Sequence, residues 1–260
     1  MLNPEQVYNY FPPYLRENPA HRKYLIKEYL QLQILDYLSG TKYVKKIAFI
    51  GGTNLRLVTG IDRFSEDLDF DCKNLSNDDF IKMTDDVIRF LNLNGLKAEA
   101  KDKQNPKLTA YRRNIYLPEF LFEIGLSGHI DERFLIKIES EDQKFSYIPM
   151  LKVIQGCGFL FSFPTPPDDI LSAMKFSALL SRSKGRDFYD AMFLSAISKP
   201  NFEFLSVKQN ISNNSELKAA LKNLLAKTNL QVKSKDFEHL LFNKKNSEKI
   251  LLFESWIEML

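Results

Sequence analysis

Apolar residues recur at two different spacings along the chain, and these spacings predict which segments are helices and which are strands. Between Ala20 and Ser39 they recur every three or four residues, as on one face of a helix, and Gly40 is placed to end it. Ser76 is placed to begin a second helix that runs to about Leu91. Short apolar runs and alternating residues predict strands at 46–50, 66–72, 97–102, 112–117 and 134–139.

The pattern becomes mostly helical after the proline-rich stretch at residues 163–169. Helices are predicted at 170–181 and 187–197, with three more after Asn214. We therefore place the domain boundary in this stretch, which divides the chain into residues 1–163 and 164–260. The predicted fold class is α+β, with a mixed β-sheet and flanking helices followed by a C-terminal helical region.

The segment RFSEDLDFDC, residues 63–72, contains three aspartates at every second position. In a strand this spacing places Asp67, Asp69 and Asp71 on one face and the intervening apolar residues on the other. Like charges at this distance repel, and a divalent metal with oxygen ligands would make the arrangement favourable. A half-buried edge strand with a wet face shows the same alternation, so the pattern alone leaves both interpretations open.

Two glycines precede this strand. Gly51 and Gly52 directly follow the apolar run IAFI and precede a predicted helical turn, so their backbone amides can approach an anion closely. The sequence lacks the Lys-Ser or Lys-Thr ending of a P-loop and the third glycine of a dinucleotide fingerprint. A simple tight turn is the alternative. If the aspartate strand pairs beside the first strand, a phosphate cradle and the carboxylates share one cleft.

A cluster of cations follows in the segment KFSALLSRSKGRDFYD, residues 175–190. Lys175 and Arg182 are seven residues apart, which aligns them along one stripe of a helix. Lys184 and Arg186 continue the positive charge, and Asp187 is placed to open the next helix, where a carboxylate suits the helix dipole. A solvated helix hairpin capped by Asp187 is the alternative. Together with the aspartate strand, we interpret the cluster as counter-charge for a triphosphate.

Composition limits the class of protein. The chain has 260 residues, of which 44% are apolar and 27% are charged, as in a globular protein with a sizeable core. Its formal charge of +3 gives no general basic field, so any contact with nucleic acid has to use a local patch. Cys72 and Cys157 lack metal-ligand or redox spacing, and no stretch approaches the roughly 18 apolar residues of a membrane span. We expect a cytoplasmic protein with no disulfide and no membrane contact.

The two motifs resemble those of a known family. The run GGTNLRLVTGIDRFSEDLDFD is similar to the first motif of the DNA polymerase β-like nucleotidyltransferases. In detail it resembles the AbiEii family, the toxins of type IV toxin-antitoxin and phage abortive-infection systems. The pattern R-x-S-x-D-x-D is matched by Arg63, Ser65, Asp67 and Asp69. The later family motif is matched by Lys175, Arg182, Lys184, Arg186, Asp187, Tyr189 and Asp190. Asn54 and Thr59 depart from the family pattern.

The resemblance implies a nucleotidyltransferase-type sheet and a metal-dependent reaction. A nucleoside monophosphate would pass from an NTP to an acceptor hydroxyl, with release of pyrophosphate. Asp67 and Asp69 would hold Mg²⁺ or Mn²⁺, while Gly51, Gly52, Thr53 and Ser65 would bind the phosphates. Lys175, with Arg182 or Arg186, would neutralise the leaving pyrophosphate. Asp187 would either orient Lys175 or contact the nucleotide, and the C-terminal region would complete the cleft.

A third carboxylate is common in this fold. In FLIKIES, residues 134–140, Lys137 and Glu139 fall on one face of the predicted strand. Glu139 is the candidate third metal ligand, and an outward-facing Glu139 beside an outward-facing Lys137 is the alternative. The family further suggests RNA, at a tRNA 3′ end, as the acceptor and an antitoxin protein encoded nearby as a partner.

Two other functions remain open at this point. A small-molecule nucleotidyltransferase of the kind that modifies antibiotics would share the aspartate strand but should not bind RNA. A non-catalytic regulatory module would bind NTP and magnesium without turnover.

Overall fold

The computed structural model describes residues 2–102 and 110–260. The chain forms two compact units. The first comprises Met1–Gly60, Phe64–Lys144 and Pro149–Thr165, and the second comprises Ile61–Arg63, Phe145–Ile148 and Pro166–Leu260. The predicted α+β fold class is confirmed. Within the described part of the chain, no helix is both long and apolar enough to cross a bilayer.

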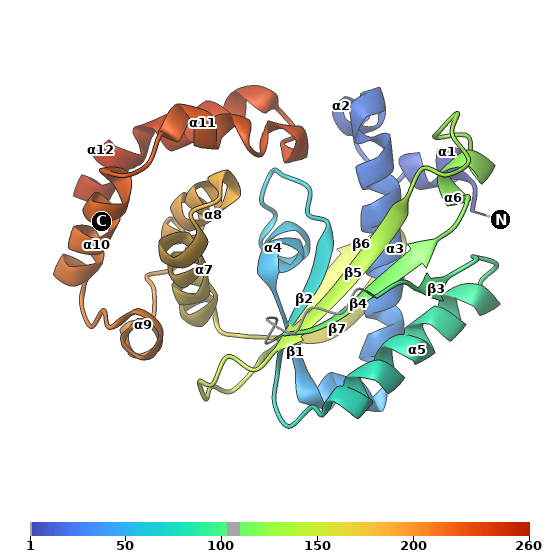
Figure 1. The fold of residues 1–260 in the computed structure, drawn as a ribbon, viewed down its shortest axis with the longest axis horizontal. Helices are drawn as coiled ribbons and strands as arrows, with labels where there is room; N and C mark the ends of the chain where they lie inside the picture. The colour runs from blue at the N-terminus through green and yellow to red at the C-terminus, as the bar shows by residue number, and fades with distance from the viewer. Residues whose placement is uncertain (1, 103–109) are drawn as a thin grey trace. The chain divides into compact units, whose positions relative to one another are not determined.

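The first unit is built on a five-stranded sheet with the strand order β1-β2-β5-β4-β3 (Figure 1). Strands β2 and β5 are parallel, and the other three neighbouring pairs are antiparallel. The strands are β1 (Ile47–Ile50), β2 (Asp67–Cys72), β3 (Glu99–Ala100), β4 (Tyr111–Leu117) and β5 (Phe134–Glu141). The strand predicted at 97–102 is therefore too long, because only two residues there pair with β4.

Helix α3 (Arg22–Ser39) supplies much of the apolar core of this unit and includes Leu25, Ile26 and Leu30, all fully buried. It begins two residues later than predicted, after a 3-10 turn at Pro19–His21. Helix α5 begins after Ser76, whose side chain accepts a hydrogen bond from the Asp79 backbone amide, as the sequence predicted. The helices of the unit are α1 (Pro4–Tyr8), α2 (Pro13–Arg16), α3, α4 (Gly51–Asn54), α5 (Asn77–Leu93) and α6 (Phe120–Glu123), and a π-helical turn at Leu55–Thr59 follows α4.

A two-stranded hairpin completes the first unit. Strands β6 (Met150–Gly156) and β7 (Phe159–Thr165) pair antiparallel through a two-residue turn. Both turn residues have positive φ, 51° at Cys157 and 84° at Gly158, as the tight hairpin turn that fits the strand twist requires. The Phe163 ring packs against Phe49 and Phe70, with ring centroids 5.8 to 6.0 Å apart. The spacing of apolar residues did not predict this hairpin.

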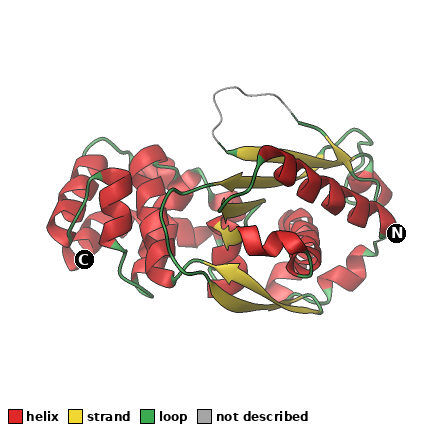
Figure 2. Ribbon diagram, turned by 90° about the horizontal axis from the view of Figure 1, so that it is seen from below, coloured by secondary structure: helices red, strands yellow, loops and turns green. Residues whose placement is uncertain are grey.

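The second unit is helical (Figure 2). Its helices are α7 (Asp168–Arg182), α8 (Gly185–Ser195), α9 (Phe202–Gln209), α10 (Asn214–Leu225), α11 (Leu230–Lys235) and α12 (Phe253–Met259), with 3-10 turns at Glu238–Leu240 and Lys244–Leu252. The sequence predicted that Asp187 opens this helix. Helix α8 instead begins at Gly185, and Asp187 is its third residue. The short segment Ile61–Arg63 is part of this unit, and Arg63 forms an isolated β-bridge with Leu241.

Glycine is required where α8 begins. A Cβ on Gly185 would lie 2.0 Å from the Lys233 carbonyl oxygen and 2.9 Å from Cδ1 of Phe237. A separation of 2.0 Å from a backbone atom can be relieved only by moving α8 away from α11.

We expect Gly185→Ala to lower the free energy of unfolding by about 2 to 4 kcal/mol, because the added methyl group overpacks a backbone contact. Urea unfolding measures the change. Gly128→Ala is the matched control, since a Cβ there meets nothing within 4 Å and Gly128 does not have a positive φ. Equal stability of the two variants would contradict the close approach of α8 and α11.

Candidate active site

Two of the three aspartates in β2 lie in half-buried positions on one face of the sheet. Asp67 and Asp69 alternate with Leu68 and Phe70, which are buried on the other face. Asp71 departs from the predicted row, because it is 2% exposed and accepts a hydrogen bond from the Gln143 backbone amide at 2.9 Å. The solvent-facing acidic pair is therefore Asp67 and Asp69.

The parallel neighbour β5 places two more charged side chains beside this pair. In the register of the two strands, Asp67 lies opposite Lys137 and Asp69 lies opposite Glu139. Paired residues on adjacent strands share a face, so all four side chains lie on the same side of the sheet. Arg112 on β4 lies opposite Glu139 and extends the row to a third strand.

The charges in this row alternate. The Lys137 Nζ atom lies 2.7 Å from Oδ2 of Asp67 and 3.4 Å from Oε1 of Glu139. The Nε atom of Arg112 donates to the same Glu139 oxygen at 2.6 Å. Burial alone would lower the pKa of Lys137, but its hydrogen bond to Asp67 and the charges of Asp67 and Glu139 outweigh burial and raise that pKa. Lys137 therefore stays a cation beside Asp67.

The glycine turn lies against Asp69. Ile50, the last residue of β1, is opposite Asp69, and Gly51 follows with a φ of 81°. A Cβ on Gly51 would lie 2.1 Å from Oδ2 of Asp69, so only glycine leaves room for that carboxylate. The next residue, Gly52, is half-buried in α4. The turn and the acidic pair are thus direct neighbours.

Two hydroxyl residues predicted to bind phosphate are buried. Thr53 donates from Oγ1 to the Asp67 carbonyl oxygen at 2.5 Å, which ties α4 to β2. Ser65 is 9% exposed, and its carbonyl oxygen accepts from Nε2 of Gln31 at 3.2 Å. In the structure both residues hold the backbone around Asp67.

The acidic pair fits a magnesium ion. Among the described residues, no three His, Cys, Asp or Glu side chains are grouped closely enough to form a metal cage. Magnesium does not need one, because it is usually bound through one or two carboxylates and completes its octahedron with water and substrate phosphate oxygens. The Asp67 carboxylate also pairs with the Lys137 ammonium, so a metal at this position would share Asp67 with a lysine.

The second unit contains a buried ion cluster around Asp190. Arg63 donates to both Asp190 oxygens at 2.7 Å, and Nζ of Lys175 lies 2.8 Å from Oδ2. The side chains of Arg63 and Asp190 are each 1% exposed and that of Lys175 is 9% exposed. Burial would raise the pKa of Asp190, but the charges of Arg63 and Lys175 outweigh it and lower that pKa well below its usual range.

The remaining predicted residues of this unit have other partners. Asp187 accepts two hydrogen bonds from Arg182, at 3.0 and 2.8 Å, and one from the Lys184 backbone amide. In this structure Lys175 pairs with Asp190 and not with Asp187, and contact of Asp187 with the nucleotide, the other predicted role, stays a prediction. The predicted stripe of cations also separates, since Lys175 is buried while Arg182 is exposed. Arg186 is half-buried, and its role stays a prediction.

Sequence reasoning missed the roles of Lys137 and Asp190. The sequence placed Lys137 beside Glu139 on one face of a strand. It did not indicate that this strand pairs with β2, which brings Lys137 opposite Asp67. Asp190 was part of the matched motif and lies fifteen residues after Lys175, its partner in the structure. A single sequence offers no signal that selects Asp190 over Asp187 as that partner.

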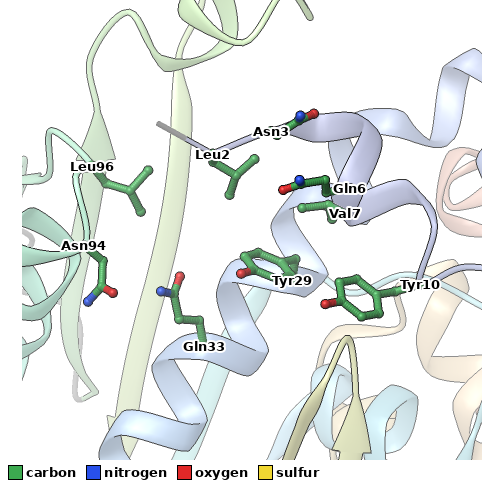
Figure 3. A pocket seen from close by; sticks show the side chains of 9 residues that line it. All are labelled: Leu2, Asn3, Gln6, Val7, Tyr10, Tyr29, Gln33, Asn94 and Leu96. Atoms are coloured by element: carbon green, nitrogen blue, oxygen red, sulfur yellow. The ribbon is translucent and has the colours of Figure 1, made fainter.

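A cavity of about 290 Å³ lies elsewhere in the first unit. Side chains from α1 and the turn after it, from α3, and from the residues that follow α5 line it, among them Gln6, Tyr10, Tyr29, Gln33 and Asn94 (Figure 3). None of the predicted site residues lines this cavity.

The fold is shared with solved structures that include a nucleotidyltransferase toxin. The structure of MenT4, a nucleotidyltransferase toxin from Mycobacterium tuberculosis H37Rv, matches with a TM-score of 0.61 at 14% identity, over 100% of this chain and 91% of that one. A putative nucleotidyltransferase from H. pylori matches with a TM-score of 0.60 at 21% identity, over 90% and 93% of the two chains. JHP933 from Helicobacter pylori matches with a TM-score of 0.53 at 19% identity, over 91% and 90%.

The family profile described as nucleotidyl transferase AbiEii toxin, type IV TA system, matches residues 33–251. The chain therefore belongs to the AbiEii family and is a nucleotidyltransferase, which confirms the resemblance seen in its two motifs. No curated protein sequence matches it significantly.

The cluster around Asp190 predicts a pH dependence of stability. A carboxyl whose pKa is lowered by folding contributes stability that is fully present above its unfolded pKa, about 3.9, and is lost as the pH falls through the folded pKa. We expect Asp190→Asn to lower the free energy of unfolding at pH 7 by about 3 to 5 kcal/mol, because it leaves two buried cations without a counter-charge. Its further loss of stability between about pH 5 and pH 2 should be shallower than that of the wild type.

Urea unfolding at several pH values measures both effects. Asp79→Asn is the control, because Asp79 also pairs with a lysine, Lys46, but lies at the surface. That variant should unfold almost as the wild type does at pH 7. An Asp190→Asn variant with wild-type stability at pH 7 would show that the cluster does not stabilise the fold.

Proposed function

We propose that this nucleotidyltransferase transfers a nucleoside monophosphate from an NTP to a hydroxyl group of an RNA acceptor, with a divalent metal bound at Asp67 and Asp69. The observation that supports the proposal is the position of the two carboxylates on one face of β2, with the Gly51 turn directly beside Asp69. In the proposed role, a bound Mg²⁺ or Mn²⁺ would polarise the phosphate oxygens and shield charge during the transfer.

The chain's own residues have separate roles in this proposal. Asp67 and Asp69 offer the oxygen ligands, and Gly51 leaves the space that Asp69 needs. Thr53 holds the Asp67 backbone in place through the hydrogen bond to its carbonyl oxygen. Gly52 and Ser65 are proposed to contact the phosphates. The roles that the resemblance implies for Lys175, Arg182, Arg186 and Asp187 stay predictions.

The acceptor and the biological role are proposed from the family. Membership in a family described as type IV toxins supports a toxin that acts in the cytoplasm and is opposed by an antitoxin protein. RNA, at a tRNA 3′ end, is the acceptor that the resemblance suggests. The formal charge of +3 requires that RNA be bound by a local basic patch and not by the whole surface.

Incubation of the purified protein with each labelled NTP, magnesium and total cellular RNA tests the reaction. Label in a tRNA-sized product would support the proposal. Turnover on small molecules without RNA labelling or RNA binding would contradict the RNA acceptor, and NTP binding without turnover on any acceptor would contradict the enzyme assignment for this chain.

We expect Asp67→Asn and Asp69→Asn each to lower the transfer rate at least about a hundredfold, because each removes half of the charge that binds the metal. The fold should survive Asp67→Asn, since Lys137 keeps Glu139 as a second carboxylate partner. Asp79→Asn is the matched control, because Asp79 lies in the same unit at the surface of α5. Unchanged transfer by Asp67→Asn, with wild-type melting temperature, would remove the metal site from the proposal.

A further inference from the structure

The acidic pair already has a cation of its own. The Lys137 ammonium lies 2.7 Å from Oδ2 of Asp67, the distance of a charge-assisted hydrogen bond. Asp67 is one of only two half-buried aspartates in β2, so the lysine occupies a large part of the acidic surface that is offered to a metal. The two cations would compete for the same carboxylate.

We propose that Lys137 is a resident counter-ion, which competes with the divalent metal for Asp67 and thereby weakens metal binding. This inference rests on the proposed function, because it concerns the same metal site. A divalent ion bound at Asp67 would lie within a few ångströms of the ammonium in its present position, where like charges repel strongly. Metal binding at Asp67 thus requires that Lys137 move.

The structure provides a place for the displaced lysine. Oε1 of Glu139 lies 3.4 Å from Nζ, so a small rotation of the lysine side chain exchanges Asp67 for Glu139 as its main partner. The side chain is 30% exposed, and a flexible four-carbon stem can make this rotation without moving the backbone. Metal-free and metal-bound forms would then differ in which carboxylate Lys137 contacts.

The same geometry changes the role expected of Glu139. Its Oε1 atom accepts from Arg112 at 2.6 Å and lies within ion-pair distance of Lys137, so two cations already compensate its charge. Glu139 is then the carboxylate with which the displaced Lys137 pairs, and Asp67 and Asp69 remain the metal ligands. The alternating row of Arg112, Glu139, Lys137 and Asp67 keeps the acidic residues from repelling one another before a metal arrives.

Manganese binding to the full-length chain, without nucleotide, tests the inference. Mn²⁺ is titrated and the free ion is followed by electron paramagnetic resonance. We expect Lys137→Met to bind Mn²⁺ about tenfold more tightly than the wild type, because the competing charge is gone while the apolar stem remains. Lys137→Gln should also bind more tightly, and Lys137→Arg, which keeps the charge, should not.

Lys46→Met is the matched control. Nζ of Lys46 lies 2.7 Å from Oδ2 of Asp79, the same distance as in the Lys137 pair, but Lys46 adjoins the Cys72 end of β2, whereas Asp67 begins the strand at its other end. This variant loses the same net charge, so a general effect of charge would tighten Mn²⁺ binding in it as well. Equal tightening in both variants, or no tightening in Lys137→Met and Lys137→Gln, would overturn the inference.

Thermal unfolding provides a second readout that does not depend on activity. Without metal, Lys137→Met should melt below the wild type, since Asp67, Asp69 and Glu139 then repel one another. Saturating Mn²⁺ should raise its melting temperature by more than that of the wild type, because a ligand that binds the folded state more tightly stabilises it more. A smaller rise than in the wild type would count against the inference.

The two proposals fail in different ways. If Asp67→Asn binds Mn²⁺ as tightly as the wild type, the metal site itself is wrong and the proposed function falls with it. If Mn²⁺ binding depends on Asp67 but Lys137→Met binds no more tightly, only the role of Lys137 is wrong.

Discussion

The candidate site depends on the register between the parallel strands β2 and β5. This register places Asp67 opposite Lys137 and Asp69 opposite Glu139. It is fixed from the other face of the sheet, where Leu68, Phe70, Ile136 and Ile138 are buried in the core. A slip by one residue would move the charged side chains into that core and the apolar ones into water. Packing on the hidden face thus sets the chemistry of the exposed face.

The second unit uses charge differently. Asp190 is buried between Arg63 and Lys175, and the cost of removing three charges from water is offset only because the geometry satisfies them together. Such a cluster adds little stability over a well-packed apolar core, but it tolerates few alternative arrangements. Arg63 comes from a segment more than one hundred residues before Asp190. The cluster therefore specifies where that early segment docks among the later helices.

Local patterns predicted the elements, and contacts distant in sequence were harder to infer. The strand with Asp67 and Asp69, the cap at Ser76 and the helical tail follow from residue spacing, and the resemblance of the motifs identified the family correctly. The hairpin of β6 and β7 was not predicted, because its Cys157–Gly158 turn lacks the asparagine or aspartate that usually marks such a turn. The ion pairs of Lys137 with Asp67 and of Asp190 with Lys175 were not predicted, because tertiary packing decides which strand lies beside another and which side chains from two helices meet. The sequence thus indicates which residues are candidates for the site, but it does not indicate which side chains they contact.

Because each unit is made of separate stretches of the chain, a single cut cannot divide the protein into its two units. The predicted boundary divides the chain once, between residues 163 and 164, whereas Ile61–Arg63 and Phe145–Ile148 belong to the second unit although they interrupt the first. A fragment that ends at Thr165 would keep Arg63 and lose Asp190 and Lys175. The Arg63 guanidinium, which is buried against Asp190 in the full chain, would then have lost this carboxylate. A fragment that begins at Pro166 would hold a buried carboxylate with one of its two cations. Exchange of the second half at a single point would keep the ion cluster only if the incoming half also supplied a carboxylate at position 190 and a lysine at position 175.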